Sequence, residues 1–523
     1  MKMKRNKWSS LWLSIAIITT LLLSACTGNQ DPGQLGDSGS DSKGNTGDLV
    51  IAVLSDATQL DPHLGTDIPS ANVYHGKIFE GLVRQDANMD IQPALATEWE
   101  QIDDTTWEFT LREGVKFHDG TEFTAEAVKK TIERVQAEET ASPRKNLFEM
   151  ITEVVVVDDH KVQLKTAYPF APLLANLSHY AAGIISPTLI DSGEKVGQNP
   201  VGTGPFKFDD WKPGQEIKLV RNDEYWGDKP KIDSVTFKVV PEDSTRIAMV
   251  ETGEAHIANP IPVTEIERVE ASDSMKLLRS DALGIDYIGF NTQKEPFNDP
   301  RVRQAISYAV DTKAIVEGVY NNVGTVATGP MGPGVWGHNA DLTGYEYNIE
   351  KAKELLAEAG YEDGFKTTIW TNDNKERMDV AEVVQSQLKG VGIDVEVKVV
   401  EWGAYLDATA KGEHDMFILG WSNMTGDADY NQYFLFHSDA RGNPGNRSFY
   451  SNPTVDELID RGRQETDPEK RQEIYAEAQA IELEEAPAIF LRNDESIAVL
   501  GKNVKGFWIS PAEIYMIDDV TIE

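Results

Sequence analysis

The single cysteine of this 523-residue chain, Cys26, constrains the fold most, because everything after it must pack without an internal disulfide bond. Hydrophobic residues make up 40% of the chain and aromatic residues 9%, which indicates a packed body rather than a disordered one. The chain is too long for one ordinary hydrophobic core, so we expect at least two lobes.

Cys26 also ends a segment that is typical of an export signal. Four basic side chains within residues 2–7 precede an apolar run over residues 8–23, which is shorter than the roughly 20 residues that span a bilayer. The order Leu23-Ser24-Ala25-Cys26 resembles the lipobox of bacterial lipoproteins. That resemblance implies a signal peptide over residues 1–25 and a diacylglycerol on Cys26, whose two acyl chains suffice for stable membrane attachment. The alternative is an ordinary signal peptide with a chance cysteine.

Residues 26–47 are mostly Gly, Ser, Asp and Asn, and this composition predicts a flexible tether. The net charge of the whole chain is −37. Such a charge repels nucleic acid, so we expect no nucleic-acid partner. The acidic balance otherwise indicates only a soluble surface.

Strand and helix patterns alternate along the rest of the chain. Residues 49–53 form an apolar run, and residues 107–111 alternate apolar with polar side chains, which predicts strands. The turn residues 158–160 lie between two further strand patterns, which predicts a hairpin. Helices are predicted after Asp299-Pro300, Asn348 and Asp467-Pro468, each of which begins with a capping residue. The class is therefore α/β, with mixed sheets.

Catalytic and metal-binding patterns are incomplete. Residues 332–337 satisfy G-x-G-x-x-G but contain a proline and open no predicted helix, which favours a loop. Residues 427–438 begin like a calcium loop, yet Gln432 replaces the required Gly and Ser438 replaces the bidentate Glu. H-E-x-x-H and G-x-S-x-G do not occur, and the nine histidines are scattered. We expect no enzymatic activity, no cofactor and no bound metal.

Several ordered segments carry a resemblance that extends over residues 48–500. The segments are 79–83 (FEGLV), 93–100 (PALATEWE), 107–127 (WEFTLREGVKFHDGTEFTAEA), 202–206 (GTGPF), 222–226 (NDEYW) and 291–299 (NTQKEPFND). Together they resemble the substrate-binding proteins of bacterial ABC transporters, of the peptide and nickel type (family 5). Residues 401–421 are similar to the dipeptide-binding branch.

The resemblance implies a two-lobed periplasmic-binding-protein type II fold with an extra subdomain in the first lobe. The expected boundaries are 48–290 for lobe I, with the subdomain at about 80–195, then 291–490 for lobe II and 491–523 for a return to lobe I. The implied function is capture of short peptides between the lobes and delivery to an ABC permease pair with cytoplasmic ATPases. The protein is expected to be a monomer.

Charged and aromatic candidates follow from the same resemblance. Asp427 matches the residue that pairs with the peptide α-ammonium, with Asp429 as a nearby competitor, and Arg377 matches the carboxylate-binding arginine of the dipeptide branch. A guanidinium suits a carboxylate because two parallel hydrogen bonds form. Trp402 and Trp421 match aromatics that line side-chain pockets. The alternatives are a surface turn for Asp427, a solvated helix start for Arg377 and core packing for the tryptophans.

Backbone candidates are expected to pair with an extended peptide, because a strand edge binds a peptide main chain whatever its side chains are. The segment from Gly420 to Ser422 matches the pairing segment of the family, and Gly65, Thr66 and Asp67 match the opposing segment of the first lobe.

Other functions stay open on the sequence. The same fold carries nickel chelates, glutathione or oligosaccharides in related proteins, and His437 is the histidine nearest to the Asp427 segment. A peptide sensor and a secreted hydrolase are further alternatives.

Overall fold

The structure is a computed structural model and describes residues 47–523. The predicted signal peptide, Cys26 and the predicted tether up to residue 46 lie outside the described residues. Within the described part, no helix combines the length and the apolar character needed to cross a membrane.

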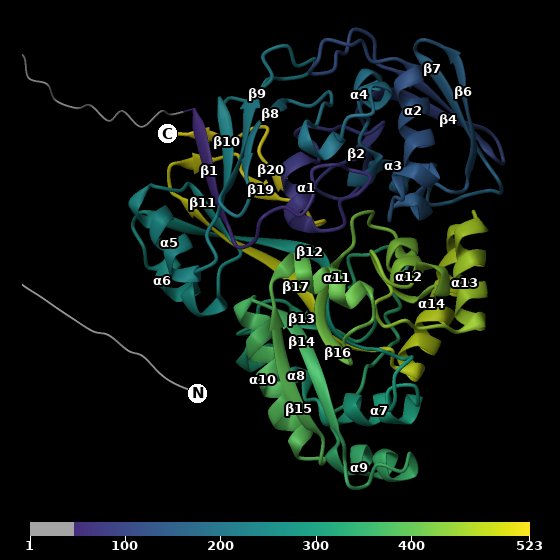
Figure 1. The fold of residues 1–523 in the computed structure, drawn as a ribbon, viewed down its shortest axis with the longest axis vertical. Coiled ribbons are helices and arrows are strands. Elements are labelled where there is room, and N and C mark those ends of the chain that lie inside the picture. Colours follow the sequence, from purple (N-terminus) through teal and green to yellow (C-terminus); the bar gives the residue numbers. More distant parts are fainter. Residues whose placement is uncertain (1–46) are drawn as a thin grey trace, which may run out of the picture. The chain divides into compact units, whose positions relative to one another are not determined.

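One mixed sheet organises most of this body (Figure 1). Its main path runs in the order β15 (Asp394–Val400), β14 (Lys366–Asn372), β16 (Met416–Ser422), β12 (Met275–Phe290), β17 (Ala488–Gly501), β11 (Ile257–Asn259), β1 (Asp48–Val53), β10 (Ser234–Val239), β9 (Glu216–Arg221) and β8 (Phe206–Lys212). The short strand β13 (Thr325–Val326) also pairs with β17.

Two long antiparallel strands, β12 and β17, connect the two halves of this sheet. The first half of β12 pairs with β17 alone, whereas its second half, from Gly284 to Phe290, also pairs with β16. At its far end β17 pairs with β11. The ladder between β12 and β17 shifts register between Asp281 and Ile285 and again between Asp286 and Tyr287. The chain therefore passes between the halves only along strands that belong to both, as Figure 1 shows for the teal β12 and the yellow β17.

The first half of the sheet contains parallel β1, β10 and β11, on which α5 (Asp243–Thr252) packs. A separate four-stranded sheet follows the order β4 (Ala96–Asp103), β5 (Thr106–Leu111), β7 (Lys161–Thr166) and β6 (Ile151–Asp158). The helix α2 (Ala125–Gln136) lies against this smaller sheet and buries its apolar side on it.

The second half has its own apolar core. Strands β14, β15 and β16 are covered by α10 (Lys375–Lys389), and α7 (Pro300–Ala309) packs on α9 (Ile349–Glu358). Ile288 and Phe290 of β12 and Leu491 of β17 are buried in this core, so the connecting strands are anchored in it. Three further helices, α12 (Ala428–Phe436), α13 (Pro453–Gln464) and α14 (Pro468–Glu485), pack on one another.

The remaining elements are short. They are α1 (Ile68–Tyr74), α3 (Leu173–Ser178), α4 (Pro187–Ser192), α6 (Ile266–Glu270), α8 (Thr312–Gly318), α11 (Trp402–Ala410), β2 (Val83–Gln85), β3 (Ile91–Pro93), β18 (Val504–Lys505), β19 (Trp508–Ile509), β20 (Tyr515–Met516) and β21 (Thr521–Ile522).

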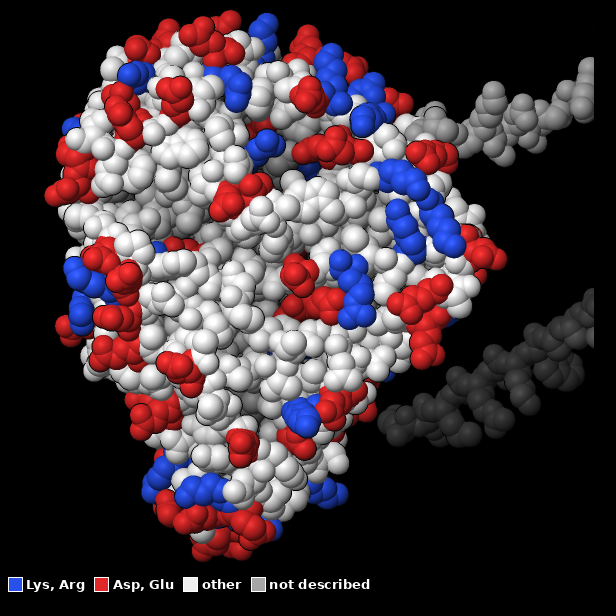
Figure 2. Space-filling view, turned by 180° about the vertical axis from the view of Figure 1, so that it is seen from behind, with Lys and Arg blue, Asp and Glu red and all other residues white. Residues whose placement is uncertain are grey.

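The predicted local elements are confirmed where their capping residues or alternation were clear. Asp299, Asn348 and Asp467 are the N-caps of α7, α9 and α14, and each side chain accepts a hydrogen bond from the first turn. The predicted hairpin is the β6–β7 pair, in which Asp158 lies opposite Lys161. On the face drawn in Figure 2, Lys and Arg side chains lie among Asp and Glu rather than in one patch.

Candidate functional site

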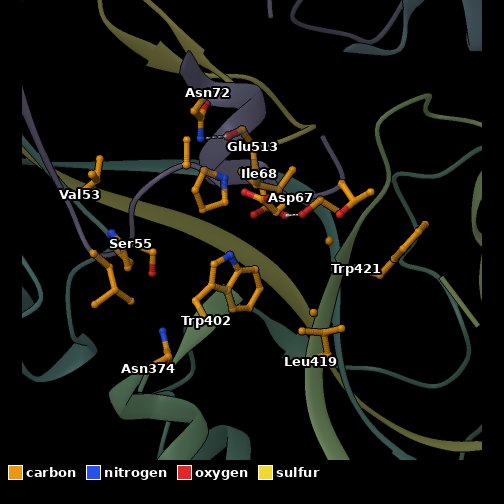
Figure 3. A pocket seen from close by; sticks show the side chains of 18 of the residues that line it. Val53, Ser55, Asp67, Ile68, Asn72, Asn374, Trp402, Leu419, Trp421 and Glu513 are labelled. Atoms are coloured by element: carbon orange, nitrogen blue, oxygen red, sulfur yellow. Dashed lines mark hydrogen bonds between the residues drawn. The ribbon is translucent and has the colours of Figure 1, made fainter. Parts of the chain in front are cut away.

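A cavity of about 290 Å³ lies where the two halves of the sheet meet. One wall comes from the chain after β1 and from α1, and the other from β16, α10 and α11. The C-terminal segment adds Glu513. Figure 3 shows Asp67 and Glu513 on one side of the cavity and Trp402 and Leu419 on the other. Its volume suits one small solute.

The cavity brings together most of the residues predicted to bind ligand. Those that line it are Thr66, Asp67, Arg377, Trp402, Gly420, Trp421 and Ser422. Gly65, Asp427 and Asp429 are not among the lining residues.

Asp427 has a partner inside the chain. It is the N-cap of α12, and its carboxylate accepts two hydrogen bonds from Arg471, with Nη1–Oδ2 at 2.6 Å and Nη2–Oδ1 at 2.7 Å. Asp429 is 2% exposed, and Arg463 Nε lies 3.4 Å from its Oδ1. The expectation that one of these carboxylates holds a ligand ammonium is therefore not met by their placement, because each faces an arginine of α13 or α14 instead of the cavity.

The loop before α12 lines the cavity with Met424 rather than with a carboxylate. Asn423 holds this loop, since its Oδ1 accepts hydrogen bonds from the backbone N–H groups of Thr425 and Gly426. Gly65 contributes indirectly: its carbonyl accepts a hydrogen bond from Arg144 Nε at 3.2 Å.

Strand β16 presents a free edge to the cavity. On one side Gly420, Trp421 and Ser422 pair with β12. On the other side β14 pairs with β16 only at Met416 and Phe417. Beyond the Ile418 carbonyl, which accepts a hydrogen bond from Tyr405, that edge has no partner strand in the described part of the chain. The predicted pairing segment therefore has an unpaired edge with which an extended peptide could form backbone hydrogen bonds.

Three guanidinium groups line the cavity, and none forms an ion pair within residues 47–523; that of Arg447 donates to the Pro444 carbonyl and to the Thr409 hydroxyl. Arg377 Nη1 donates to Asn372 Oδ1 at 3.1 Å, and the group lies 5.7 Å from the Trp402 ring centre. Arg144 is 1% exposed and donates to the Gly65 carbonyl and to the hydroxyls of Tyr430 and Tyr180. Burying a cation without a counter-ion is costly, so these groups can take an anionic ligand group favourably.

Three carboxylates gather at the floor of the cavity. Asp286 and Asp494 share Arg492, whose Nη2 lies 2.6 Å from one and 2.7 Å from the other. Glu513 accepts a hydrogen bond from the Ser422 hydroxyl. Burial raises the pKa of Glu513 to about 8, and the nearby Asp494 shifts that pKa in the same direction. This floor therefore holds three acidic side chains around one arginine, Arg492, and the raised pKa of Glu513 favours its neutral form at pH 7.

The tryptophans offer hydrogen-bond donors as well as apolar surface. Trp421 is 7% exposed and stacks on Tyr430, with ring centres 5.1 Å apart. The indole N–H groups of Trp402 and Trp421 have no hydrogen-bond partner among the described residues. A buried indole N–H usually finds an acceptor, so both groups are free to donate to a polar ligand.

Sequence reasoning missed Arg144, Asp286, Asp494 and Glu513. Arg144 lies in a loop, and its surroundings come from distant segments. His437, the histidine considered for a metal chelate, lies near Asp460 and not in the cavity. No histidine lines the cavity, and residues 47–523 contain no cluster of three or more metal-binding side chains.

Comparison with known proteins places these features in context. A sequence profile described as bacterial extracellular solute-binding proteins, family 5 middle, matches residues 90–443. The glutathione-binding protein GsiB of Pectobacterium atrosepticum is 35% identical over 486 residues, which cover 91% of this chain and 94% of that protein.

Two solved structures cover nearly the whole chain. The ABC transporter-associated periplasmic binding protein DppA from Helicobacter pylori, in complex with the peptide STSA, has a TM-score of 0.86 at 33% identity, and the match covers 91% of this chain and 98% of DppA. NikZ from Campylobacter jejuni, in complex with Ni(L-His), has a TM-score of 0.82 at 26% identity, with 90% and 97% covered. These matches confirm the predicted two-lobed α/β fold.

Proposed function

Because the chain belongs to family 5 of the bacterial extracellular solute-binding proteins, we propose that it captures short peptides and peptide-like solutes and delivers them to an ABC importer. The cargo class follows from the relatives, of which one is named for glutathione and another was solved with a tetrapeptide. Glutathione is itself a modified tripeptide, so both belong to one chemical class.

The free edge of β16 is the observation that carries this proposal. A peptide enclosed between two lobes loses water from its amide groups, at about 1–3 kcal/mol for each group left unsatisfied. The open edge between Gly420 and Ser422 supplies donors and acceptors without regard to side chains. Binding of varied short peptides follows.

The charges on the walls favour a zwitterionic cargo. Arg377 and Arg144 are available to carboxylates, whereas Glu513 and Asp494 favour a cationic group. A neutral oligosaccharide could form hydrogen bonds with these groups but would balance none of their charges. No histidine lines the cavity in the described part of the chain, so a nickel chelate would have to bring its own nitrogen ligands, as Ni(L-His) does.

Delivery requires a state that the importer recognises. We propose that ligand stabilises a closed arrangement of the lobes, with β12 and β17 as the connecting strands, and that a permease pair with cytoplasmic ATPases reads this arrangement. The proposed lobes follow the predicted boundaries, 48–290 and 291–490, with a return over 491–523. No chemical step on the cargo is required.

The proposed location is the outer face of the cell membrane, through a lipid on Cys26. Mass spectrometry of the mature N-terminus tests this, since a diacylglycerol on Cys26 adds a defined mass. Cys26→Ala should release the protein from the membrane, and size-exclusion chromatography of that form should show the predicted monomer.

Native mass spectrometry of protein purified without denaturation tests the cargo. Adducts with the masses of dipeptides, tripeptides or glutathione support the proposal, and titration calorimetry with the same solutes should then give saturable binding. A co-purified solute without amide groups would overturn it.

A further inference from the structure

Two glycines hollow the floor of the cavity beside the free edge of β16. In the β12–β16 ladder Gly284 lies opposite Ser422, and Asp286 lies opposite Gly420, so all four residues share one face. A Cβ atom at Gly420 would lie 3.1 Å from both Arg377 Nη2 and Asp286 Oδ1. A side chain at this position would therefore displace the charged groups that approach the strand here.

The second glycine, Gly284, leaves room for the carboxylates of Glu513 and Asp494. A Cβ atom at Gly284 would lie 2.5 Å from Glu513 Oε1 and 3.6 Å from Asp494 Oδ2. Both carboxylate oxygens therefore approach the same point of β12. Gly420 and Gly284 are diagonal neighbours in this antiparallel ladder, and such positions are roughly 7–8 Å apart. Arg377 and Glu513 therefore approach neighbouring points on one face, where a ligand that carries an ammonium and a carboxylate on the same carbon could meet both groups.

An independent observation points to a ligand at this place. Asp286, Asp494 and Glu513 also line a second, smaller cavity of about 150 Å³, which Tyr320 lines as well. Tyr320 is 2% exposed, and its hydroxyl has no hydrogen-bond partner among the described residues. A buried hydroxyl without a partner is rare in folded proteins, and a bound polar group or its water would satisfy it.

The charge at this junction is also incomplete. Arg492 is shared between Asp286 and Asp494, and Glu513 has a neutral hydroxyl as its side-chain partner. Arg377 has an amide oxygen as its partner and no carboxylate. Among the described residues, therefore, neither Glu513 nor Arg377 has an ion-pair partner of its own.

We propose that Glu513 and Asp494 bind the ammonium, and Arg377 the carboxylate, of one α-amino acid head of the ligand. This inference rests on the proposed function and narrows it, because an ordinary peptide carries its ammonium and carboxylate at opposite ends. A γ-glutamyl peptide carries both on one carbon. The solute class that fits is a small peptide-like molecule with a free α-amino acid head.

The test compares reduced glutathione, which is γ-linked, with its isomer Glu-Cys-Gly, in which both bonds are ordinary peptide bonds. Their composition and thiol are identical. Titration calorimetry of the wild-type protein should show at least tenfold tighter binding of the γ-linked form. Glu513→Gln should lower that preference to threefold or less, and Asp494→Asn should lower it in the same direction.

Glu482→Gln is the matched control. Glu482 is fully buried, burial raises its pKa to about 8, and it lines neither cavity. This variant should retain the wild-type preference. Thermal unfolding of each variant separates loss of binding from loss of fold.

The outcomes distinguish the proposed amino acid subsite from the proposed capture of peptides. Equal binding of both isomers by the wild type, or an undiminished preference in folded Glu513→Gln and Asp494→Asn, overturns the subsite and leaves peptide capture standing. Binding of neither isomer overturns the subsite, and with a native mass spectrum free of peptide adducts it overturns the proposed cargo as well.

Discussion

Two groups of buried carboxylates differ in how their charge is balanced. At the start of α12, Asp427 and Asp429 each face an arginine, Arg471 and Arg463, and neither lines the cavity. Each negative group there has its own positive partner. The arrangement ties α12 to α13 and α14, and such a balanced pair has no need of a ligand.

At the floor of the cavity, by contrast, the carboxylates do not each have an arginine of their own. Asp286 and Asp494 share one arginine, and Glu513 accepts a hydrogen bond from a hydroxyl. An acidic residue near a cleft is therefore evidence for a ligand site only when it lacks a cationic partner in the fold. Charges that the chain balances hold the fold, whereas charges that it leaves unbalanced are available to a ligand.

Removing Arg471, the partner of Asp427, should have the largest effect on the free energy of unfolding. Arg471→Met leaves Asp427 without its cation in a mostly buried place, whereas Asp429 keeps Arg463, and breaking a buried pair in this way costs about 3–5 kcal/mol. Urea unfolding should show a loss of this order. The affinity of the folded variant for peptide should change less than twofold, and so should that of Asp427→Asn. A tenfold loss of affinity in Asp427→Asn would restore that residue as the ammonium partner.

Removing an unbalanced cation should instead reduce binding. Arg144→Met deletes a buried guanidinium that has no carboxylate partner within the described residues. A charge-assisted hydrogen bond contributes about 1.5–3 kcal/mol, so the affinity for an anionic or zwitterionic ligand should fall roughly 10- to 100-fold by calorimetry. Arg303→Met is the control, because Arg303 is also buried but donates to backbone carbonyls of Phe297, Glu485 and Ala486, none of which lines the cavity. Affinity loss in the control alone would contradict the assignment of Arg144.

The pH dependence of stability can be compared for two buried glutamates, Glu513 at the cavity floor and Glu482 outside the cavity. Burial raises the pKa values of Glu513 and Glu482 to about 8, above the value near 4.3 of an unfolded glutamate. The native state then holds more protons than the unfolded state between these values, so each glutamate costs stability as the pH rises from about 4.5 to 8. Glu513→Gln and Glu482→Gln should therefore gain stability relative to the wild type over this range, on the order of 1 kcal/mol per pH unit at most.

Bound ligand should change the stability gained by Glu513→Gln but not that gained by Glu482→Gln. Around Glu513, Asp494 and Asp286 raise its pKa and Arg377 lowers it, and a bound ammonium would lower it further. Unfolding at pH 5, 6.5 and 8 with saturating ligand should abolish the advantage of Glu513→Gln and preserve that of Glu482→Gln. The same ligand effect on both variants would show that the cation does not sit beside Glu513.

Local structure was predictable where one short segment contains all of its determinants. Asp299, Asn348 and Asp467 identified their helices because a capping side chain bonds to the turn that follows it. The hairpin of β6 and β7 followed from turn residues between two strand patterns. Arg377, Trp402 and the β16 segment, which the family resemblance singled out, line the cavity.

The balance of charge was not predictable from the sequence. Arg471, which engages Asp427, follows 44 residues later on another helix, and no local pattern joins them. Glu513 reaches the cavity floor through the C-terminal return of the chain, 91 residues from its partner Ser422. Sequence identifies where acids and bases occur along the chain, but only the tertiary arrangement shows which of them have partners.

The smallest expected effect comes from filling the hollow itself. Gly420→Ala places a Cβ atom 3.1 Å from Arg377 Nη2 and from Asp286 Oδ1, which is closer than ordinary contact, so the end of the flexible Arg377 side chain must shift by a few tenths of an ångström. Because Arg377 then presents its guanidinium to the ligand at a poorer angle, we expect affinity for reduced glutathione to fall about threefold to tenfold, with little change in unfolding free energy. Gly318→Ala is the control, since a Cβ atom there meets nothing within 4 Å and the position lies outside both cavities. Calorimetry of the two variants compares an alanine beside unbalanced charge with one in open space. Equal affinities would mean that the hollow between β12 and β16 is not where the ligand head lies.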